Sequence, residues 1–271
     1  MIDIWQEIYS TIKRNKLRTF LTGFAVAWGI FMLIVLLGAG NGLIHAFEES
    51  SSERALNSIK IYPGWTSKSY DGLKEGRKIQ LDNKDLRITD TRFPDYVIKA
   101  GASIWQGTVT ISFGSEYASV GLAGVFPNHI EIETIKLFKG RFINETDIKE
   151  RRKVIVLHKK TAEILFHKTH TEPIGQFVNM GNVAYRVVGL CNDKGDSGEK
   201  PALIPFSTLQ TIYNKGDKLS CLTIATKNME TIEANNNFEK EYRKALGANH
   251  RFDPTDNSAL WIWNQFTNYL Q

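Results

Sequence analysis

Cysteine is scarce in this sequence. Among 271 residues only Cys191 and Cys221 occur. Two cysteines that lie so far apart cannot by themselves build a zinc site or a disulfide scaffold. An oxidising compartment would permit them to pair, but nothing in the sequence requires that they do.

The sequence also lacks the motifs of nucleotide hydrolysis and of serine nucleophiles. No G-x-x-x-x-G-K-[ST] phosphate loop occurs, and the nearest stretch, GLKEGRK from Gly72, has neither the spacing nor the hydroxyl side chain that would hold Mg²⁺. No G-x-S-x-G elbow is present. We therefore expect no catalytic residue and no cofactor, and the sequence favours an anchored hydrolase least.

Clustered metal ligands and long basic runs are missing too. His158, His167 and His170 lie among lysines with no carboxylate at ligand spacing, so we expect solvated histidines and no metal site. The 34 Lys and Arg residues are interleaved with 29 Asp and Glu residues, as in KEGRKIQLDNKDLR, which leaves a formal net charge of +5. Such mixing is typical of a solvated surface that binds no nucleic acid.

Long apolar runs are absent except for one near the N-terminus. Residues 19–47 contain no Asp, Glu, Lys or Arg, and about 20 apolar helical residues cover the hydrocarbon core of a bilayer. We expect a transmembrane helix over residues 19–44. A cleaved signal peptide is one alternative, although its apolar region would be only about 7–15 residues long. A buried helix of a soluble protein is the other.

The charges that flank this segment predict its orientation. Lys16 and Arg18 precede it, with Arg14 just before them, whereas Glu48 and Glu49 follow it. Basic residues near a span stay on the cytoplasmic side. We therefore expect a cytoplasmic N-terminus and an extracytoplasmic main domain.

The first residues carry a further membrane signal. IDIWQEIYSTI places its apolar side chains, Trp5 among them, on one face of a helix. Such a helix either lies in the inner interface of the membrane or packs against other protein. Residues 1–18 thus form a cytoplasmic amphipathic helix with a basic flank, and we assign membrane placement to Trp5, Arg14, Lys16 and Arg18.

Behind the span, residues 45–256 alternate between strand and helix patterns, which predicts an α+β domain. TVTISF and YASVGLAGV form a hairpin around Gly114, and PIGQFVNMGNVAYRVVGL forms two strands around Gly181. KVIVLHKKTAEILF indicates a strand followed by a helix. Asp82 is expected to cap a helix that ends before Pro94, and Gly247 to end the last helix.

Two aromatic pairs stand out in the polar part of the chain. Trp65 and Tyr70 form the first pair, and Trp261 and Trp263 form the second. We expect them to serve in packing or as membrane-proximal anchors rather than as platforms on which a ligand stacks.

In its order of features the chain resembles the permease subunits of MacB-type ABC transporters, the FtsX-like permease family. The likeness covers nearly the whole sequence, although each stretch alone is a weak signal. The stretches that carry it are RNKLRTFLTGFAVAWGIFMLIVLLGAGNGL, IKIYPGWTSKSYDGLKEGRKIQLDNKDL, GLAGVFPNHIEIETIKLFKGRFINETD, KVIVLHKKTAEILF with PIGQFVNMGNVAYRVVGL, and ALIPFSTLQTIY with HRFDPTDNSALWIWN.

The resemblance implies a dimeric permease in the bacterial inner membrane, with four spans per subunit and an ATPase that is separate or fused. It implies a split porter-like α/β part at residues 50–125 and 206–250, an inserted β-rich part at residues 126–205, and a stalk helix at residues 257–271. Motion driven by ATP would pass through the spans to the outer domain for export or release of an amphiphilic, peptide or lipoprotein substrate. A periplasmic adaptor or a lipoprotein is a further implied partner.

The sequence departs from this family pattern at its end. It stops at Gln271 without a second apolar run and without an ATPase. We expect a fragment of a four-span permease. The alternative is a bitopic sensor or adaptor whose outer domain binds an envelope protein or a ligand.

Overall fold

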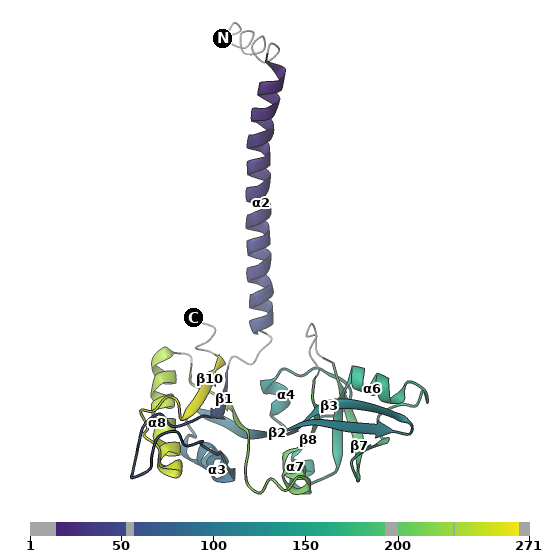
Figure 1. Cartoon of the computed structure of the whole chain (residues 1–271), viewed down its shortest axis with the longest axis vertical. Helices are drawn as coiled ribbons and strands as arrows, with labels where there is room; N and C mark the ends of the chain where they lie inside the picture. Colours follow the sequence, from purple (N-terminus) through teal and green to yellow (C-terminus); the bar gives the residue numbers. More distant parts are fainter. Residues whose placement is uncertain (1–14, 53–56, 193–199, 230, 266–271) are drawn as a thin grey trace. The chain divides into compact units, whose positions relative to one another are not determined.

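The computed structural model describes residues 15–52, 57–192, 200–229 and 231–265. The chain divides into two compact units, Met1–Glu53 and Arg54–Gln271. The described part of the first unit is a long helix, and that of the second holds a mixed sheet with its helices (Figure 1). The α+β class with one N-terminal apolar helix is therefore confirmed.

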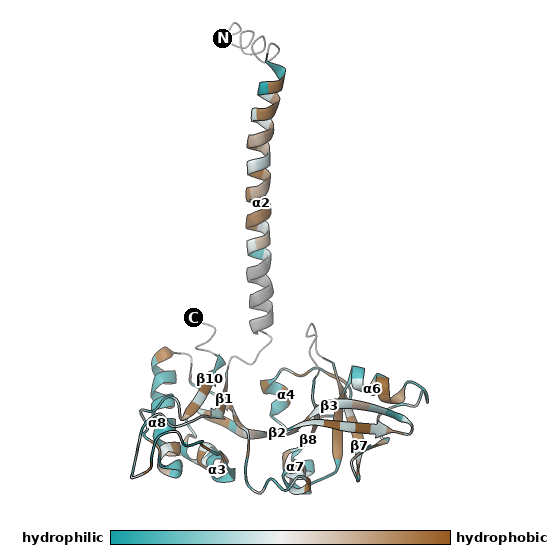
Figure 2. Cartoon of the chain, viewed as in Figure 1, coloured by the Kyte–Doolittle hydropathy of each residue, from teal (hydrophilic) through white to brown (hydrophobic). Residues whose placement is uncertain are grey.

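Helix α2 (Lys16–Ser52) makes up the described part of the first unit, and Figure 2 shows few hydrophilic positions along it. Its stretch Lys16–Gly42 is 27 residues long, is apolar enough to cross a membrane, and has no buried residue. At about 1.5 Å per residue this stretch exceeds the roughly 30 Å of a bilayer core. A helix that is apolar all round and uncovered by protein is suited to lipid.

An aromatic stripe runs along the first half of α2. The rings of Phe20, Phe24, Trp28 and Phe31 follow one another with centroids 6.2, 5.9 and 5.7 Å apart. Their spacing of three or four residues places them on one side of the helix.

The second unit is built on a ten-stranded sheet with the order β10-β1-β9-β2-β3-β8-β5-β7-β4, and β6 pairs with both β2 and β7. The strands are β1 (Ser58–Pro63), β2 (Val97–Phe113), β3 (Glu116–Val125), β4 (Leu137–Gly140), β5 (Val154–His158), β6 (Phe177–Met180), β7 (Val183–Cys191), β8 (Ala202–Pro205), β9 (Cys221–Thr226) and β10 (Leu260–Asn264). The helices are α3 (Asn83–Arg92), α4 (His129–Ile132), α5 (Glu145–Lys149), α6 (Lys159–Phe166), α7 (Phe206–Ile212) and α8 (Ile232–His250).

Strand β2 joins the two halves of this sheet. Its first part pairs with β9 and its second part with β3, and the register shifts between Trp105 and Gly107. Gly107 has φ +94°, a backbone conformation that residues with a Cβ avoid. A glycine therefore suits this bulge. On one side of the bulge lie the strands β10, β1 and β9. On the other side lie β3, β4, β5, β6, β7 and β8 (Figure 1). The assignment of a porter-like part to residues 50–125 and 206–250, and of an inserted part to residues 126–205, stays a prediction.

Several elements were predicted correctly from local signals. The hairpins around Gly114 and Gly181 are confirmed as β2–β3 and β6–β7, with φ +59° and +60° at the two glycines. Asp82 caps α3 in a capping box with Asp85, and the helix ends before Pro94 as expected. The strand and helix expected in KVIVLHKKTAEILF are β5 and α6.

The expected stalk helix at residues 257–271 is wrong for its described part, because Leu260–Asn264 form strand β10 and pair with β1. Residues 266–271 lie outside the described residues. Every position of LWIWN except the last is apolar, so the alternation between a buried and an exposed face is invisible in the sequence.

Gly247 does not end the last helix, which was a wrong expectation. Helix α8 continues to His250 and ends at Arg251, whose φ of +53° provides a left-handed cap. Gly247 is buried, and a Cβ there would lie 2.9 Å from the carbonyl oxygen of Phe252. The glycine therefore allows the chain after α8 to pass close to the helix. It does not end the helix.

Candidate functional site

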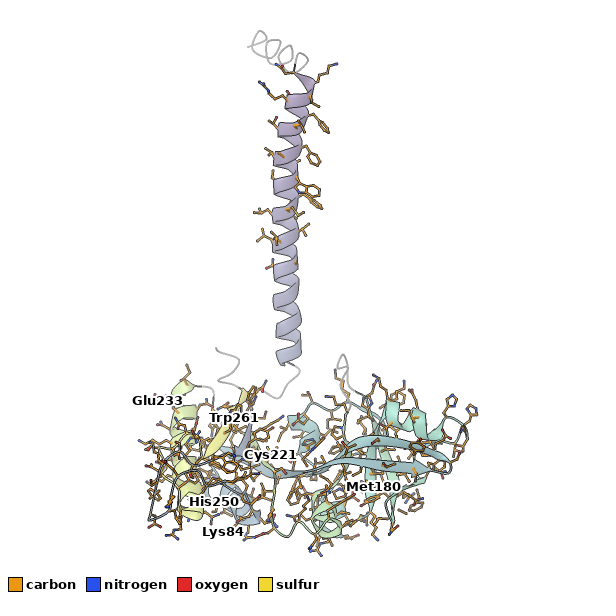
Figure 3. All side chains as sticks on the ribbon, viewed as in Figure 1. Lys84, Met180, Cys221, Glu233, His250 and Trp261 are labelled. Atoms are coloured by element: carbon orange, nitrogen blue, oxygen red, sulfur yellow. The ribbon has the colours of Figure 1, made fainter. Side chains whose placement is uncertain are left out.

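In the half of the sheet formed by β10, β1, β9 and β2, the two faces differ. Side chains such as Ile61 and Leu222 are fully buried in the main core together with Phe238 of α8. On the opposite face, Tyr62 of β1 lies across from Trp261 of β10, and these side chains are 41% and 66% exposed. Figure 3 places Trp261 and His250 on opposite sides of this sheet. One face therefore packs on helices, and the other carries exposed aromatic side chains.

The short helix α4 lies on this second face. Asn128, just before α4, packs on Gly101 of β2, where a Cβ would lie 2.2 Å from the side-chain oxygen of Asn128. Glu133, just after α4, forms an ion pair with Lys60 of β1. These two contacts fix α4 on the sheet from both ends.

A pocket of about 250 Å³ opens between α4 and the sheet. Trp105, Ala123 and Leu203 contribute sheet side chains to its lining, and His129 of α4 and Glu133 just after that helix line it as well. The ring of Trp105 lies over Gly121, where a Cβ would come within 2.5 Å of the indole. Trp105 is thus held at the pocket although its side chain is 55% exposed.

The ionisable groups at this pocket are strongly affected by burial. Burial lowers the pKa of His129 to about 4. The negative charge of Glu133 acts to raise this pKa, and the positive charge of Lys60 acts to lower it further. Burial disfavours the charged form of Glu133, but Lys60, His129 and Lys200 together hold its pKa below the usual range. At neutral pH the pocket therefore presents a neutral imidazole and an ionised carboxylate that is already paired.

A thiol lies beneath the same face. Burial raises the pKa of Cys221 to about 12, and burial also raises the pKa of its neighbour Tyr62. Such a thiol stays protonated and is no nucleophile at neutral pH. Cys191 and Cys221 are two separate buried thiols, so the pairing that the sequence would permit is not formed.

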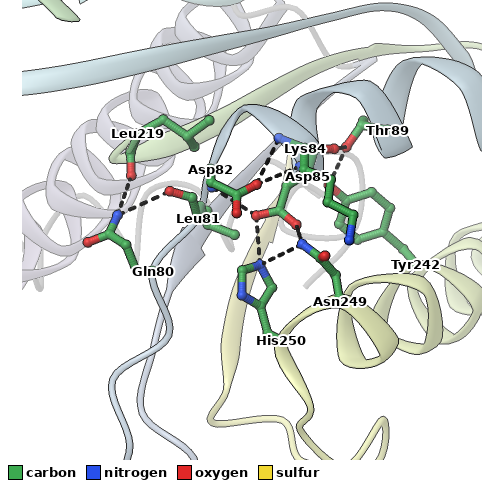
Figure 4. A network of polar contacts seen from close by, with 10 residues as sticks. All are labelled: Gln80, Leu81, Asp82, Lys84, Asp85, Thr89, Leu219, Tyr242, Asn249 and His250. Atoms are coloured by element: carbon green, nitrogen blue, oxygen red, sulfur yellow. Dashed lines mark hydrogen bonds and ion pairs between the residues drawn. The ribbon is translucent and has the colours of Figure 1, made fainter. Parts of the chain in front are cut away.

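A second polar cluster lies on the helical side of the sheet (Figure 4). The fully buried carboxylate of Asp85 accepts hydrogen bonds from the backbone N–H of Asp82 at 2.9 Å and from Asn249 Nδ2 at 2.7 Å, and it lies 2.7 Å from His250 Nε2. Thr89 Oγ1 and the Tyr242 hydroxyl share a hydrogen bond of 2.7 Å nearby. These contacts join α3 to α8, and because the carboxylate is enclosed by its partners, the cluster acts in stability.

Of the residues assigned to membrane placement, the structure describes two. Lys16 and Arg18 lie in the first turn of α2, and their role stays a prediction. Trp5 and Arg14 fall outside the described residues.

The exposed fractions of Trp65 and Trp263, 59% and 44%, show that packing in the core is not the role of these two members of the aromatic pairs.

The histidines expected to be solvated divide into two kinds. His167 and His170 are exposed, whereas His158 is buried and caps α6 by accepting a hydrogen bond from the Lys160 N–H. The prediction was wrong for His158 because a cap can use an imidazole in place of the usual hydroxyl or carboxylate. Within the described ranges, no three His, Cys, Asp or Glu side chains gather closely enough to hold a metal ion.

Sequence reasoning missed the residues of the pocket. His129 and Glu133 are four residues apart, which is a helical spacing, and this is the one local signal that could have pointed to them. Trp105 and Leu203 reach the pocket only because β3 pairs with β2 on one side and with β8 on the other. That pairing is long-range and leaves no trace in a short stretch of sequence.

A family model described as the MacB-like periplasmic core domain matches residues 19–237. The macrolide export ATP-binding/permease protein MacB of Bartonella henselae is 27% identical over 224 residues, which is 82% of this chain and 33% of that protein. The MacB of Syntrophobacter fumaroxidans is 26% identical over 187 residues, or 69% of this chain and 26% of that protein. The chain thus spans about a third or less of the length of these curated relatives.

Two solved structures share the fold. The periplasmic region of MacB from Actinobacillus actinomycetemcomitans superposes with a TM-score of 0.64 at 19% identity, covering 81% of this chain and 94% of that one. The extracellular domain of the ABC-type transporter YknZ from Gram-positive bacteria gives a TM-score of 0.60 at 21% identity, covering 77% of this chain and all of that one. At these identities the likeness establishes the fold.

Proposed function

Because this chain belongs to the family of MacB-like periplasmic core domains, we propose that it is the anchoring helix and outer domain of an ABC transporter permease. The observation that carries the proposal is the extent of the family match. It begins at residue 19, inside the apolar helix, and continues through the sheet as far as α8. Span and outer domain therefore belong to one family unit rather than to an unrelated anchor and module.

The proposed place of this unit is the bacterial inner membrane, with the N-terminus in the cytoplasm and the sheet in the periplasm. The basic side chains of Lys16 and Arg18 at the start of α2 support this orientation, since Arg and Lys near a span favour the cytoplasmic side. The absence of acidic residues from the whole first turn of α2 agrees with it.

The proposed mechanism is a relay without chemistry in this chain. ATP hydrolysis in a partner ATPase would move the spans, and the outer domain would follow in a rigid-body change between two conformations. The curated relatives carry ATP-binding and permease functions in their names, which supports an ATPase as the first partner. A second permease subunit and a periplasmic adaptor or lipoprotein are the further proposed partners, and an amphiphilic molecule, a peptide or a lipoprotein is the proposed cargo.

Co-purification tests this proposal. The full-length gene product would be tagged, solubilised in mild detergent and purified, and its associated proteins would be identified by mass spectrometry and assayed for ATP hydrolysis. We expect an ATPase with a phosphate loop whose turnover rises when the permease is present. A preparation from cells with the untagged protein is the control for proteins that bind the resin.

The opposite result has a clear meaning. If no ATPase accompanies the protein and ATP turnover in the eluate equals that of the untagged control, the permease proposal is rejected. A bitopic adaptor would then account better for a single span followed by an outer domain.

A further inference from the structure

A second pocket of the outer domain opens along one edge of β7. The end of β4 and the loop before β6 flank it, and its lining includes Gly140, Ile174, Gly175, Arg186 and Val188. We propose that this β7 pocket binds a carboxylate on a short aliphatic chain, with the carboxylate on the guanidinium of Arg186 and the chain against Ile174 and Val188. The inference concerns binding by the outer domain alone and does not depend on the proposed transport function.

Backbone hydrogen bonds hold the walls of the β7 pocket in place. The Gly175 N–H donates to the carbonyl oxygen of Val187, and the Val187 N–H donates to the carbonyl oxygen of Gln176, each at 2.8 Å. Farther along β7, the Arg141 N–H donates to the carbonyl oxygen of Val188 at 2.8 Å. Both flanking segments are therefore fixed to the same strand, so the pocket is formed before a ligand binds.

The size and walls of the β7 pocket set the apolar part of the ligand. Its volume of about 300 Å³ lies at the lower end of the roughly 300–1,000 Å³ of pockets for drug-sized molecules. Gly140 has φ +79°, and a Cβ there would lie 2.3 Å from the Val188 carbonyl oxygen and 2.9 Å from Ile174 Cδ1. The glycine thus lets the Ile174 side chain lie close to β7. Phe177, which is opposite Arg186 and 59% exposed, adds apolar surface beside the pocket.

An unpaired guanidinium sets the polar part of the ligand. Arg186 is exposed, and among the described residues its side chain forms no hydrogen bond and no ion pair. Its Nη2 would lie 3.9 Å from a Cβ on Gly175, which places the guanidinium at the wall of the pocket. The planar fork of N–H donors on a guanidinium matches the two oxygens of a carboxylate. Because Arg186 is exposed, a ligand can reach these donors.

Arg141, the other charged residue of the lining, is already paired. Its guanidinium donates to the buried carboxylate of Asp147 at 2.6 and 3.1 Å. Lys139 and Glu172, which flank the lining in the sequence, pair with each other at 2.7 Å. The lining contains no carboxylate that would repel an anion. Arg186 therefore supplies a single positive charge, which favours a monovalent carboxylate over a dianion such as phosphate.

Methyl NMR of the full chain provides the test. The isoleucine δ1 methyl groups would be labelled with carbon-13 and the protein held in uncharged detergent micelles, and the Ile174 resonance would be assigned by its loss in Ile174→Val. The probes are 4-methylpentanoate and 4-methylpentanamide, which share one aliphatic chain and differ in charge. We expect a saturable shift of the Ile174 resonance and a dissociation constant about tenfold lower for the carboxylate.

Arg186→Gln is the decisive variant, because it removes the charge and keeps a hydrogen-bond donor. We expect it to raise the dissociation constant of 4-methylpentanoate about tenfold and to leave that of 4-methylpentanamide unchanged, which would also show that the pocket is intact. Lys153→Gln is the matched control, since Lys153 is exposed and its carbonyl oxygen accepts the Arg186 N–H, but it does not line the pocket. Both dissociation constants should stay within about twofold in this control.

Three results would overturn the proposal. Absence of a saturable Ile174 shift, or equal dissociation constants for the two probes in the unaltered protein, would show that the pocket does not select a carboxylate. Equal effects of Arg186→Gln and Lys153→Gln would show a general attraction of anions. An Ile174 shift that merely parallels that of Ile30 would show partition into the micelle, because Ile30 lies in α2.

A third probe distinguishes two sources of the carboxylate. N-acetyl-glycyl-leucine carries the same chain and carboxylate at the C-terminus of a peptide. Binding of this probe together with 4-methylpentanoate indicates that the pocket accepts a peptide C-terminus. Binding of 4-methylpentanoate alone indicates a free acid, and both results support the site. Because no ATPase is present in this experiment, its failure would leave the permease proposal untouched.

Discussion

Two ionisable side chains in the outer domain are held in different ways. Asp85 is fully buried, and its carboxylate has partners on α3 and at the end of α8. His129 is half-buried beside the sheet, and its buried Nδ1 has no hydrogen-bond partner among the described residues. The contacts of Asp85 therefore stabilise the fold. The environment of His129 instead lowers the stability of the fold by an amount that depends on pH.

Removal of the Asp85 carboxylate should destabilise the domain strongly. In Asp85→Ala, Asn249 and His250 lose their acceptor and α3 loses half of its capping box. We expect a loss of about 2–4 kcal/mol in the free energy of unfolding, measured by denaturant titration of the full chain. Asp90→Ala on the exposed side of the same helix is the control, and its effect should stay within about 0.5 kcal/mol. Equal effects of the two changes would show that the buried contacts contribute nothing.

The pH dependence of stability should carry the signature of His129. Its pKa is about 4 in the folded protein and about 6.5 when unfolded, so below pH 6.5 the unfolded state binds the proton more readily. Stability from this group is therefore complete above pH 6.5 and is lost as the pH falls toward 4. Between pH 7 and pH 5 we expect a loss of about 2 kcal/mol that is absent from His129→Phe.

The control for this titration is His167→Phe, which alters an exposed imidazole on the α6 side of the domain. Its stability should fall between pH 7 and pH 5 by as much as that of the unaltered protein. If His129→Phe shows the same fall as well, the imidazole of His129 is not buried in its neutral form.

At the scale of elements, helix α8 shows a conflict between local preference and packing. Gly247 lies inside the helix, where alanine would be favoured by about 1 kcal/mol on propensity alone. The carbonyl oxygen of Phe252 would, however, lie 2.9 Å from an added Cβ. That oxygen belongs to the backbone, so contact can be relieved only by moving the chain that returns over α8.

We therefore expect Gly247→Ala to destabilise the domain, by roughly 1–2 kcal/mol, against the sign of helix propensity. Thermal unfolding followed by circular dichroism would measure it. Ala248→Gly, at the next and exposed position, calibrates the propensity term and should cost about 1 kcal/mol. A stabilised Gly247→Ala protein would mean that the Phe252 segment adapts without cost.

The elements that could be predicted from the sequence are those with local signals. The turns at Gly114 and Gly181 need a positive φ, and the capping box at Asp82 needs a fixed spacing, so both leave marks in a few residues. Strand β10 leaves no such mark, because LWIWN is apolar at four consecutive positions. The pocket could not be predicted, since its walls come from β2, β3, α4 and β8, and only the completed sheet brings them together.

At the scale of the whole molecule, the orientation of the chain should depend on the basic residues before the span. In the combined variant Arg14→Glu, Lys16→Glu and Arg18→Glu, the charge that keeps this end in the cytoplasm is reversed. We expect a substantial fraction of the outer domain to become inaccessible to protease added outside spheroplasts. Persistence of full accessibility would contradict the charge argument.

A matched control reverses the same number of charges elsewhere. Lys149→Glu, Arg151→Glu and Lys227→Glu alter exposed positions of the outer domain, far along the chain from α2. These changes should leave protease accessibility as it is in the unaltered protein. A similar loss of accessibility in both variants would indicate a general effect of net charge and not an effect of position.

The antiparallel pairing of β1 with β10 has a mechanical consequence. Ile59 lies opposite Asn264, so the chain enters β1 from α2 and leaves β10 at the same end of the pair. A force that pulled these two connections apart would separate β1 from β10 by breaking their hydrogen bonds one after another. A pull on both connections together would instead load all the hydrogen bonds between β1 and β9 in shear at once. The domain thus withstands tension far better when its two connections move in concert.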